Sequence, residues 1–124
     1  MTSNGMGLQV SIRRVGSVTI VDFQGRATFG SDSDSLSDCL RKLIDDGERN
    51  VLLNFAGLTQ LDSSGLSALA RAYVSRKRKG GSLKLLSLRG SVKLVLETLR
   101  LDTIIPSFED EAQAVASFSK AASA

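Results

Sequence analysis

Hydrophobic and polar positions follow a period of two at the start of the chain. Apolar residues alternate with polar ones from Leu8, which predicts a first strand with Val10 and Ile12 on the same buried face. The β-branched segment 18–23 follows a short turn. We therefore expect a hairpin whose second strand ends at Gly25.

From Ser31 the period changes to that of amphipathic helices. We expect one helix from Ser31 to Asp46, one from about Ser64 to Lys79, one opened by Ser91 and a last one capped by Ser107. The first three apolar stripes are Leu36, Cys39, Leu40, Leu43 and Ile44; Leu66, Leu69, Ala70, Tyr73 and Val74; and Val92, Val95, Leu96 and Leu99.

Short apolar runs separate these helices and complete the pattern. The run 51–55 predicts a central strand covered on both faces, 83–86 predicts another strand, and 104–105 a last short one before Pro106. The order β-β-α-β-α-β-α-β-α predicts an α/β fold, with about five strands in a mixed sheet and about four helices covering it. With 124 residues, one domain over 1–124 is expected, its core at about 8–118.

Composition removes several chemistries. The chain has no His and a single Cys, so a Ser-His-Asp triad is impossible and a zinc enzyme improbable. Cys39 lies on an apolar stripe and reads as a small core residue. We expect no enzymatic activity, no cofactor and no metal. The single Cys, the short apolar runs and the absence of a secretory pattern predict a cytoplasmic chain without membrane insertion.

A net charge of +3 is compatible with nucleic-acid binding, but other features of the sequence do not favour it. Much of the excess lies in the basic run 76–79 at a helix end, where cations are ordinarily favourable. Aromatic residues make up only 5% of the chain, so no stacking platform is evident. We expect no direct binding of nucleic acid.

The most unusual local sequence is Asp62-Ser63-Ser64-Gly65, at the entrance of the second predicted helix. An N-cap alone would explain one of these residues, because Asp or Ser oxygens accept hydrogen bonds from the free N–H groups of a helix start. Gly65 weakens a first turn, which suggests a close backbone approach. The loop from Asn54 to Ser63 is expected to leave the carboxyl end of a strand, where ligands and partners gather, with the Ser63 hydroxyl outward. An enzyme using Ser63 as nucleophile would need a base that the sequence does not show.

In this setting, Leu61 to Leu66 resembles the signature of the bacterial anti-anti-sigma factors of the STAS domain family. The resemblance extends from Leu8 to Phe118 and implies a single STAS-like domain. It further implies that Ser63 is phosphorylated by an anti-sigma factor that is also a serine kinase. The unmodified protein would bind that kinase and release the sigma factor, and a PP2C-type phosphatase would restore binding after phosphorylation.

The resemblance also implies a partner-binding surface around Ser63 and a protein that is monomeric when free. Family members often carry an acidic residue and then an Asp after the second strand, where this chain has Arg26 and Thr28. A solvated helix face explains the exposed positions of the second helix equally well. A STAS scaffold, or an accessory subunit of a membrane transporter, is the alternative function. The expected partner-binding residues are Asp62, Ser64, Gly65, Ser67, Arg71, Arg26 and Thr28.

Overall fold

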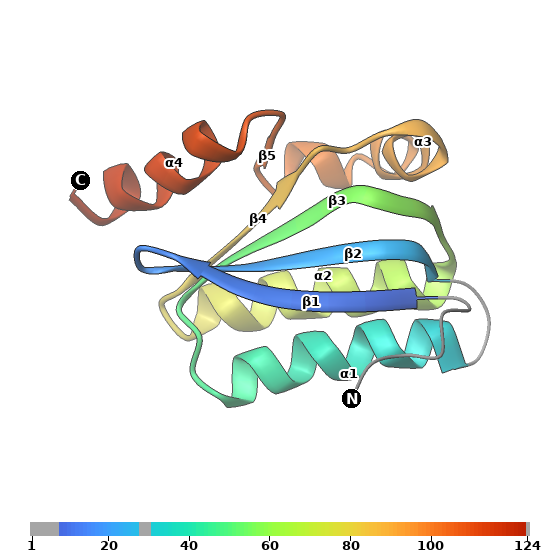
Figure 1. Ribbon diagram of the computed structural model, residues 1–124, viewed down its shortest axis with the longest axis horizontal. Helices are drawn as coiled ribbons and strands as arrows, with labels where there is room; N and C mark the ends of the chain where they lie inside the picture. Colours follow the sequence, from blue (N-terminus) through green and yellow to red (C-terminus); the bar gives the residue numbers. More distant parts are fainter. Residues whose placement is uncertain (1–7, 28–30, 124) are drawn as a thin grey trace.

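The computed structural model describes residues 8–27 and 31–123, apart from the side chains of 27, 31–35, 44 and 120–123. The order of strands and α-helices is the expected one, with a short 3-10 helix η1 added before the last strand (Figure 1). The elements are β1 (Leu8–Val15), β2 (Val18–Ala27), α1 (Ser31–Asp45), β3 (Asn50–Leu61), α2 (Ser63–Arg78), β4 (Ser82–Leu86), α3 (Gly90–Thr98), η1 (Leu101–Thr103), β5 (Ser107–Phe108) and α4 (Glu111–Ser123).

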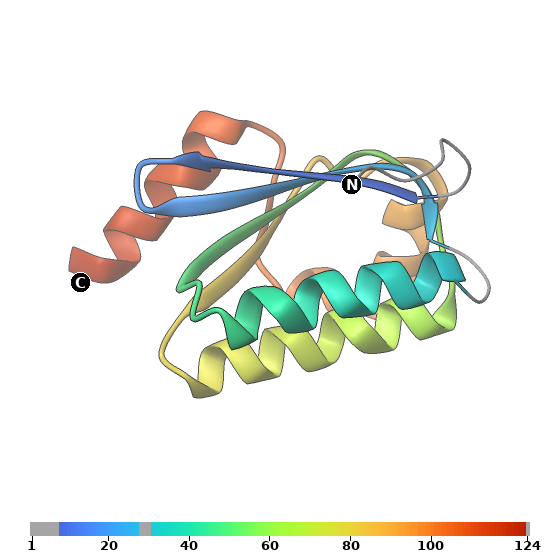
Figure 2. The ribbon, with the colours of Figure 1, turned by 60° about the horizontal axis from the view of Figure 1, so that its bottom comes forward.

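The strands form one mixed sheet in the order β1-β2-β3-β4-β5, with β1 antiparallel to β2 and every later pair parallel. Helices α1 and α2 lie side by side along one face (Figure 2). Their buried side chains join those of the inner strands in the larger core cluster. Helix α4 packs Ala114 and Phe118 against β2, β3 and β4 in a second cluster on the other face. The predicted α/β fold is thus confirmed.

Strands β2 and β3 are longer than predicted and pass the positions where we expected them to end. β2 continues beyond Gly25 to Ala27, and β3 continues beyond Phe55 to Leu61. Two register shifts between the strands accommodate the extension. At one of them, a Cβ on Gly57 would lie 2.7 Å from the Phe23 carbonyl oxygen, so only glycine fits. Most of the predicted loop 54–63 is therefore curved strand.

The expected burial of β1 is wrong beyond its first residue. Leu8 is buried, but Val10 is 40% exposed and Ile12 55% exposed. The strand itself forms because it pairs over its whole length with β2 across a tight turn at Gly16, whose φ is 61°. β1 is an edge strand, and the buried helix side chains cover the inner strands instead. The alternation of apolar and polar residues predicted the strand correctly, but it did not show that the helices leave most of this strand uncovered.

Two of the predicted apolar helix stripes include a residue that is exposed in the structure. Val74 is 51% exposed on α2, and Leu99 follows the end of α3 and is also exposed. Leu69 and Leu96 on the same stripes are fully buried, as predicted. Arg76 differs in the opposite sense, because it is buried although it begins the basic run 76–79. Only the remainder of that run is exposed, which weakens the charge argument further.

The segment before the last helix also departs from the prediction. Residues 104–105 form a turn after η1 rather than a strand, and Ile105 is buried in the larger core cluster. The strand lies after Pro106, whose carbonyl oxygen accepts a hydrogen bond from Leu85 N. Ser107 thereby belongs to β5 and does not cap the helix. Asp110 does so instead, its carboxylate accepting from Gln113 N at 2.9 Å.

An ion-pair network ties the edge of the sheet to the start of α4. Arg13 Nε donates to Asp22 Oδ2 at 2.7 Å, and its Nη2 donates to Glu111 Oε1 at 2.7 Å. Asn54 Nδ2 adds a hydrogen bond to Asp22 at 2.7 Å. The hydrogen bonds from Arg13 lower the pKa of both the Asp22 and the Glu111 carboxyl. The network thereby favours the ionised carboxylates in the folded state.

Acid is therefore expected to destabilise the fold partly through this network. A carboxyl whose folded pKa is depressed stabilises the fold above its unfolded pKa, and this contribution is lost as pH falls through the folded pKa. Since the Arg13 and Glu111 side chains are 41% and 40% exposed, the loss should amount to about 1 kcal/mol. Arg13→Gln should flatten the acid limb of stability against pH in urea unfolding from pH 7 to 3. Identical curves for the two proteins would contradict this.

Candidate partner-binding site

The candidate site begins where β3 ends and α2 starts. Asp62 adopts an extended conformation, with φ −91° and ψ −179°, and its carboxylate Oδ1 accepts a hydrogen bond from Gly65 N at 2.9 Å. Its carbonyl oxygen accepts the first backbone hydrogen bond of the helix, from Leu66 N at 2.9 Å. Asp62 is thus the N-cap of α2, as one interpretation of the sequence predicted.

Ser63 and Ser64 are the first two residues of α2, and both are exposed. The first N–H groups of a helix have no carbonyl partner within it and form the positive end of its dipole. Ser63 therefore presents a hydroxyl at a position that tolerates added negative charge. The helix start is meanwhile held by the neighbouring Asp62 carboxylate, so the cap hydrogen bond does not depend on the Ser63 hydroxyl.

Gly65 is buried, and the close approach expected at this position comes from the protein's own side chains. A Cβ on Gly65 would lie 2.5 Å from Leu61 Cδ1 and 3.1 Å from Leu36 Cδ2. Both leucines belong to the core cluster between the sheet and α1. The glycine therefore lets the first turn of α2 settle onto the end of β3. Its contribution to partner binding is indirect, because it sets where Ser63 and Ser64 stand.

Gly65→Ala is expected to lower the free energy of unfolding by about 1 kcal/mol. Alanine gains about 1 kcal/mol over glycine in an open helix, but overpacking a core costs about 1–3 kcal/mol, and the two crowded leucines are buried. Urea unfolding measures the difference, with Ser64→Ala as the control in the same turn. A stabilised Gly65→Ala protein would mean that helix propensity outweighs the contact.

The end of β2 lies beside the site, as expected. Arg26 pairs with Gln60 and Ala27 with Leu61, so Arg26 is next to the last residues before Asp62. Its side chain is exposed. Thr28, the other candidate from this segment, lies outside the described residues. The structure thus brings Arg26 to the same edge of the sheet as Ser63.

Further along α2, the predicted positions Ser67 and Arg71 are exposed. With Ser63 they recur every four residues and share one side of the helix. The exposed Val74 and Arg78 follow on that side. Val74 is the residue that the sequence pattern missed, because the helical stripe placed it in the core. This side of α2 thus carries one exposed apolar side chain between two exposed arginines.

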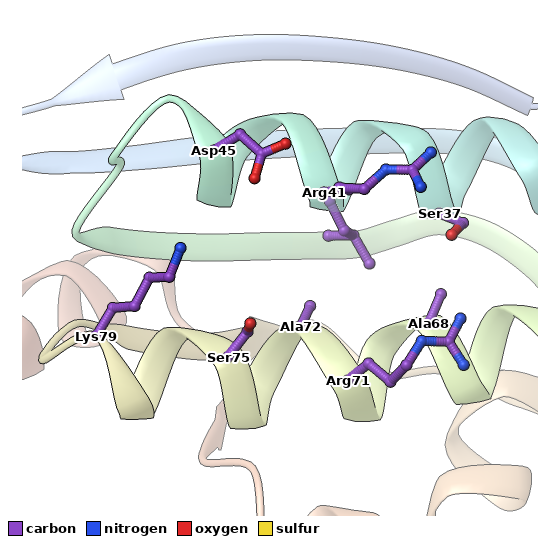
Figure 3. A pocket seen from close by; sticks show the side chains of 9 residues that line it. Ser37, Arg41, Asp45, Ala68, Arg71, Ala72, Ser75 and Lys79 are labelled. Carbon is purple, nitrogen blue, oxygen red and sulfur yellow. The ribbon is translucent and has the colours of Figure 1, made fainter.

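A groove of about 250 Å³ runs between α1 and α2 (Figure 3). Both the Arg41 and the Arg71 side chains extend toward the N-terminal ends of the two helices, the end at which Ser63 lies. Arg41 pairs with Asp38 at 2.6 Å, whereas no ion pair of the described residues involves Arg71. The groove residues are Ser37, Leu40, Arg41, Asp45, Ala68, Arg71, Ala72, Ser75 and Lys79. The polar residues on the α1 side of this groove, Ser37, Arg41 and Asp45, were not among the site residues predicted from the sequence.

Three further features bear on the chemistry of the site. In the described part of the chain, no three His, Cys, Asp or Glu side chains are grouped so that they could hold a metal ion. None of the helices there is both long and apolar enough to cross a membrane. Cys39 is partly buried, and burial raises the pKa of its thiol, in keeping with a core role. The site presents the exposed Ser63 hydroxyl on the same side of α2 as the exposed Arg71.

Solved structures with this fold include several regulators. The chain is similar to an anti-sigma factor antagonist from Mycobacterium paratuberculosis, with 14% identity and a TM-score of 0.79 over 96% of this chain and 99% of that one. It is similar to the phosphorylated Bacillus cell fate determinant SpoIIAA, with 16% identity and a TM-score of 0.67 over 86% and 96% of the two chains. A sulfate transporter family protein from Wolinella succinogenes gives 18% identity and a TM-score of 0.71 over 87% and 89%.

At these identities the likeness establishes the fold alone. The search of curated proteins found no match. The family comparison reaches further, because the model of the STAS domain matches residues 9–114 and so includes both the Asp62 cap and Ser63. The chain therefore belongs to the STAS domain family.

Proposed function

We propose that this protein is an anti-sigma factor antagonist controlled by phosphorylation of Ser63. In its unmodified form it binds an anti-sigma factor serine kinase in the cytoplasm and so releases the sigma factor. Phosphorylation of Ser63 ends this binding, and a PP2C-type phosphatase restores it. Transcription is then controlled without contact between this protein and DNA.

The observation that carries the proposal is the separation of two roles at the start of α2. Asp62 holds the helix through its hydrogen bond to Gly65 N, while the adjacent Ser63 is exposed. A phosphate on Ser63 can therefore be accommodated by the N-terminal N–H groups without loss of the cap. A modification that changes the surface but preserves the fold is what a reversible switch of binding requires.

The partner surface of this proposal consists of the exposed residues of α2 from Ser63 to Arg78, the neighbouring Arg26 and the groove beside α1. Arg71 has no carboxylate partner among the described side chains, and exposed Val74 lies one turn away. A kinase surface with carboxylates around a small apolar contact would complement it, because buried apolar contacts and paired charges together give affinity and specificity.

The proposal is tested by adding the unmodified protein to a complex of a candidate kinase and its sigma factor from the same genome. Size-exclusion chromatography should show free sigma factor and a new complex that contains this protein. Arg71→Glu should weaken that complex at least tenfold, whereas Arg49→Glu, an exposed change outside the partner surface, should not. Equal affinities for both variants would show that the α2 surface does not bind the kinase. Failure of every candidate kinase to bind would contradict the proposed function.

The substitution Asp62→Asn tests separately the two roles of the Asp62 side chain, as a helix cap and as a negative charge. Asparagine is as good an N-cap as aspartate, so the melting temperature should change little. If the carboxylate also orients the Ser63 hydroxyl for phosphoryl transfer, the phosphorylation rate should fall at least tenfold at saturating kinase. Autoradiography with labelled ATP measures the rate. An unchanged rate would limit the role of Asp62 to the cap.

A second function remains open because the same fold occurs in a protein of the sulfate transporter family. In that case the chain would be a scaffold or an accessory subunit of a transporter, and its α2 surface would bind a partner without phosphorylation. The two functions differ in one result. A scaffold keeps its partner in the presence of ATP and kinase, whereas an antagonist loses it.

A further inference from the structure

The outer edge of β1 has no partner strand within the described chain. β1 pairs with β2 alone, over all eight of its residues from Leu8 to Val15. In an antiparallel pair, alternate residues direct N–H and C=O away from the partner. Because Val15 and Val18 close a two-residue turn, the outward groups are those of Leu8, Val10, Ile12 and Arg14. A long edge of this kind is a template for another strand.

Apolar side chains are concentrated along the same edge. Three of the seven exposed large hydrophobic residues of the described chain, Val10, Ile12 and Val15, lie in this one strand. Val10 and Ile12 are neighbours on one face, since side chains two positions apart point the same way. The face is the one that carries α1, because Leu8 on the same side of β1 joins the core cluster of that helix. An apolar strip therefore borders an unpaired backbone edge.

The two cations of β1 are ion-paired within the chain, with side chains that are 41% and 61% exposed. Arg13 is held by Asp22 and Glu111, and Arg14 donates to Glu48 at 2.5 Å and to Thr19 at 3.1 Å. Every cation of β1 is therefore bound to carboxylates of its own chain. Natural edges use exposed charges, proline or bulges to prevent pairing, and β1 pairs in regular register without a proline.

The sequence of β1 is complementary to itself in an antiparallel arrangement. If Ser11 lies opposite Ser11 of a second copy, Val10 lies opposite Ile12 on both sides of the centre. The outward backbone groups of Val10 and Ile12 then meet each other, and their side chains form a four-residue apolar cluster. In the same register Arg13 faces Gln9 rather than another cation, so no like charges are opposed.

We propose that two copies of this protein associate through β1 and form a continuous ten-stranded sheet about a twofold axis at Ser11. The occupant of the edge is thus a second copy, whereas the sequence alone led us to expect a monomer. An eight-residue edge buries less surface than the ~1,600 Å² of a standard interface. The dimer should accordingly be weak, with a dissociation constant between about 10 µM and 1 mM.

Sedimentation equilibrium of the full chain tests the proposal without any other partner, so its outcome is separate from that of the proposed function. The average mass should rise toward twice the monomer mass with increasing concentration. Ile12→Lys should raise the dissociation constant at least tenfold, whereas Leu94→Lys, the same kind of change at another exposed site, should leave it unchanged. Circular dichroism shows that both variants fold. A monomer at every concentration, or equal effects of the two variants, would overturn the proposal.

A cross-link tests the register. Opposed residues that are not hydrogen-bonded have Cα atoms about 4.5 Å apart, within the range of a disulfide. Ser11→Cys in a Cys39→Ala background should therefore form a covalent dimer on mild oxidation. Gln9→Cys in the same background should not, because it would face Arg13. A cross-link at position 9 with none at position 11 would overturn the proposed axis.

Discussion

Phosphorylation of Ser63 is expected to weaken binding to the anti-sigma factor kinase by about 100-fold or more, equivalent to about 2.8 kcal/mol. A phosphoserine carries about −1.5 to −2 charges at pH 7, and here it would stand beside the Asp62 carboxylate. Within an interface from which water is excluded, like charges of this magnitude oppose association. Added charge and bulk within the partner surface thus account for the effect.

Isothermal titration calorimetry on the unmodified and the enzymatically phosphorylated protein measures this difference. Ser63→Ala is the matched control, and it should retain binding within about threefold, because it lacks only a hydroxyl. The melting temperature of the phosphorylated protein should remain close to that of the parent, since Asp62 supplies the cap. A reduction in affinity below fivefold, or a phosphorylated protein that unfolds, would contradict a switch at the surface.

Leu69→Ala is expected to lower the free energy of unfolding by about 2–5 kcal/mol. Leu69 is 0% exposed and lies in the core cluster beneath α2. Its removal leaves a cavity between the helix and the sheet, at the element that carries the partner surface. Because the free energy of unfolding of many single domains is only about 5–15 kcal/mol, this one substitution is expected to remove a large part of the stability.

The control for Leu69→Ala lies on the same helix. Val74 belongs to the same stripe in the sequence but is 51% exposed, so Val74→Ala should change stability by about 0.5 kcal/mol or less. Urea unfolding of both variants provides the comparison. Equal losses would mean that Val74 is buried in solution, and the apolar position in the proposed partner surface would then be wrong.

The fold was largely predictable from local patterns. Periodicity and short apolar runs located the four α-helices and four of the five strands of the described chain, because an amphipathic element must bury its apolar side against a sheet or a helix. Errors appeared where the decisive contact is distant in the sequence. Gly25 was predicted to end β2, because the register shifts that let the strand continue beside β3 are not visible in the local sequence. The burial of Arg76 likewise depends on distant residues, since Arg76 packs beside Gly81 and donates to the carbonyl oxygen of Glu48.

Part of the local geometry of the candidate site was predictable from the sequence, but its construction was not. The exposure of Ser63 and the cap by Asp62 follow from local helix chemistry, which the sequence records directly. The reason for Gly65 required the side chains of Leu61 and Leu36, which come from two other elements. The contribution of Arg41 to the groove likewise depends on the pairing of α1 with α2, which no pattern within either helix reveals.

The central claim, that Ser63 is the phosphorylated residue of an antagonist, is tested most directly by intact-mass spectrometry. The protein is incubated with ATP and each anti-sigma factor kinase encoded by the same genome, alongside Ser63→Ala and Ser64→Ala. We predict one added phosphoryl group on the parent and on Ser64→Ala, and none on Ser63→Ala. Modification of Ser63→Ala to the same extent as the parent, or no modification by a kinase that binds stably, would contradict the claim.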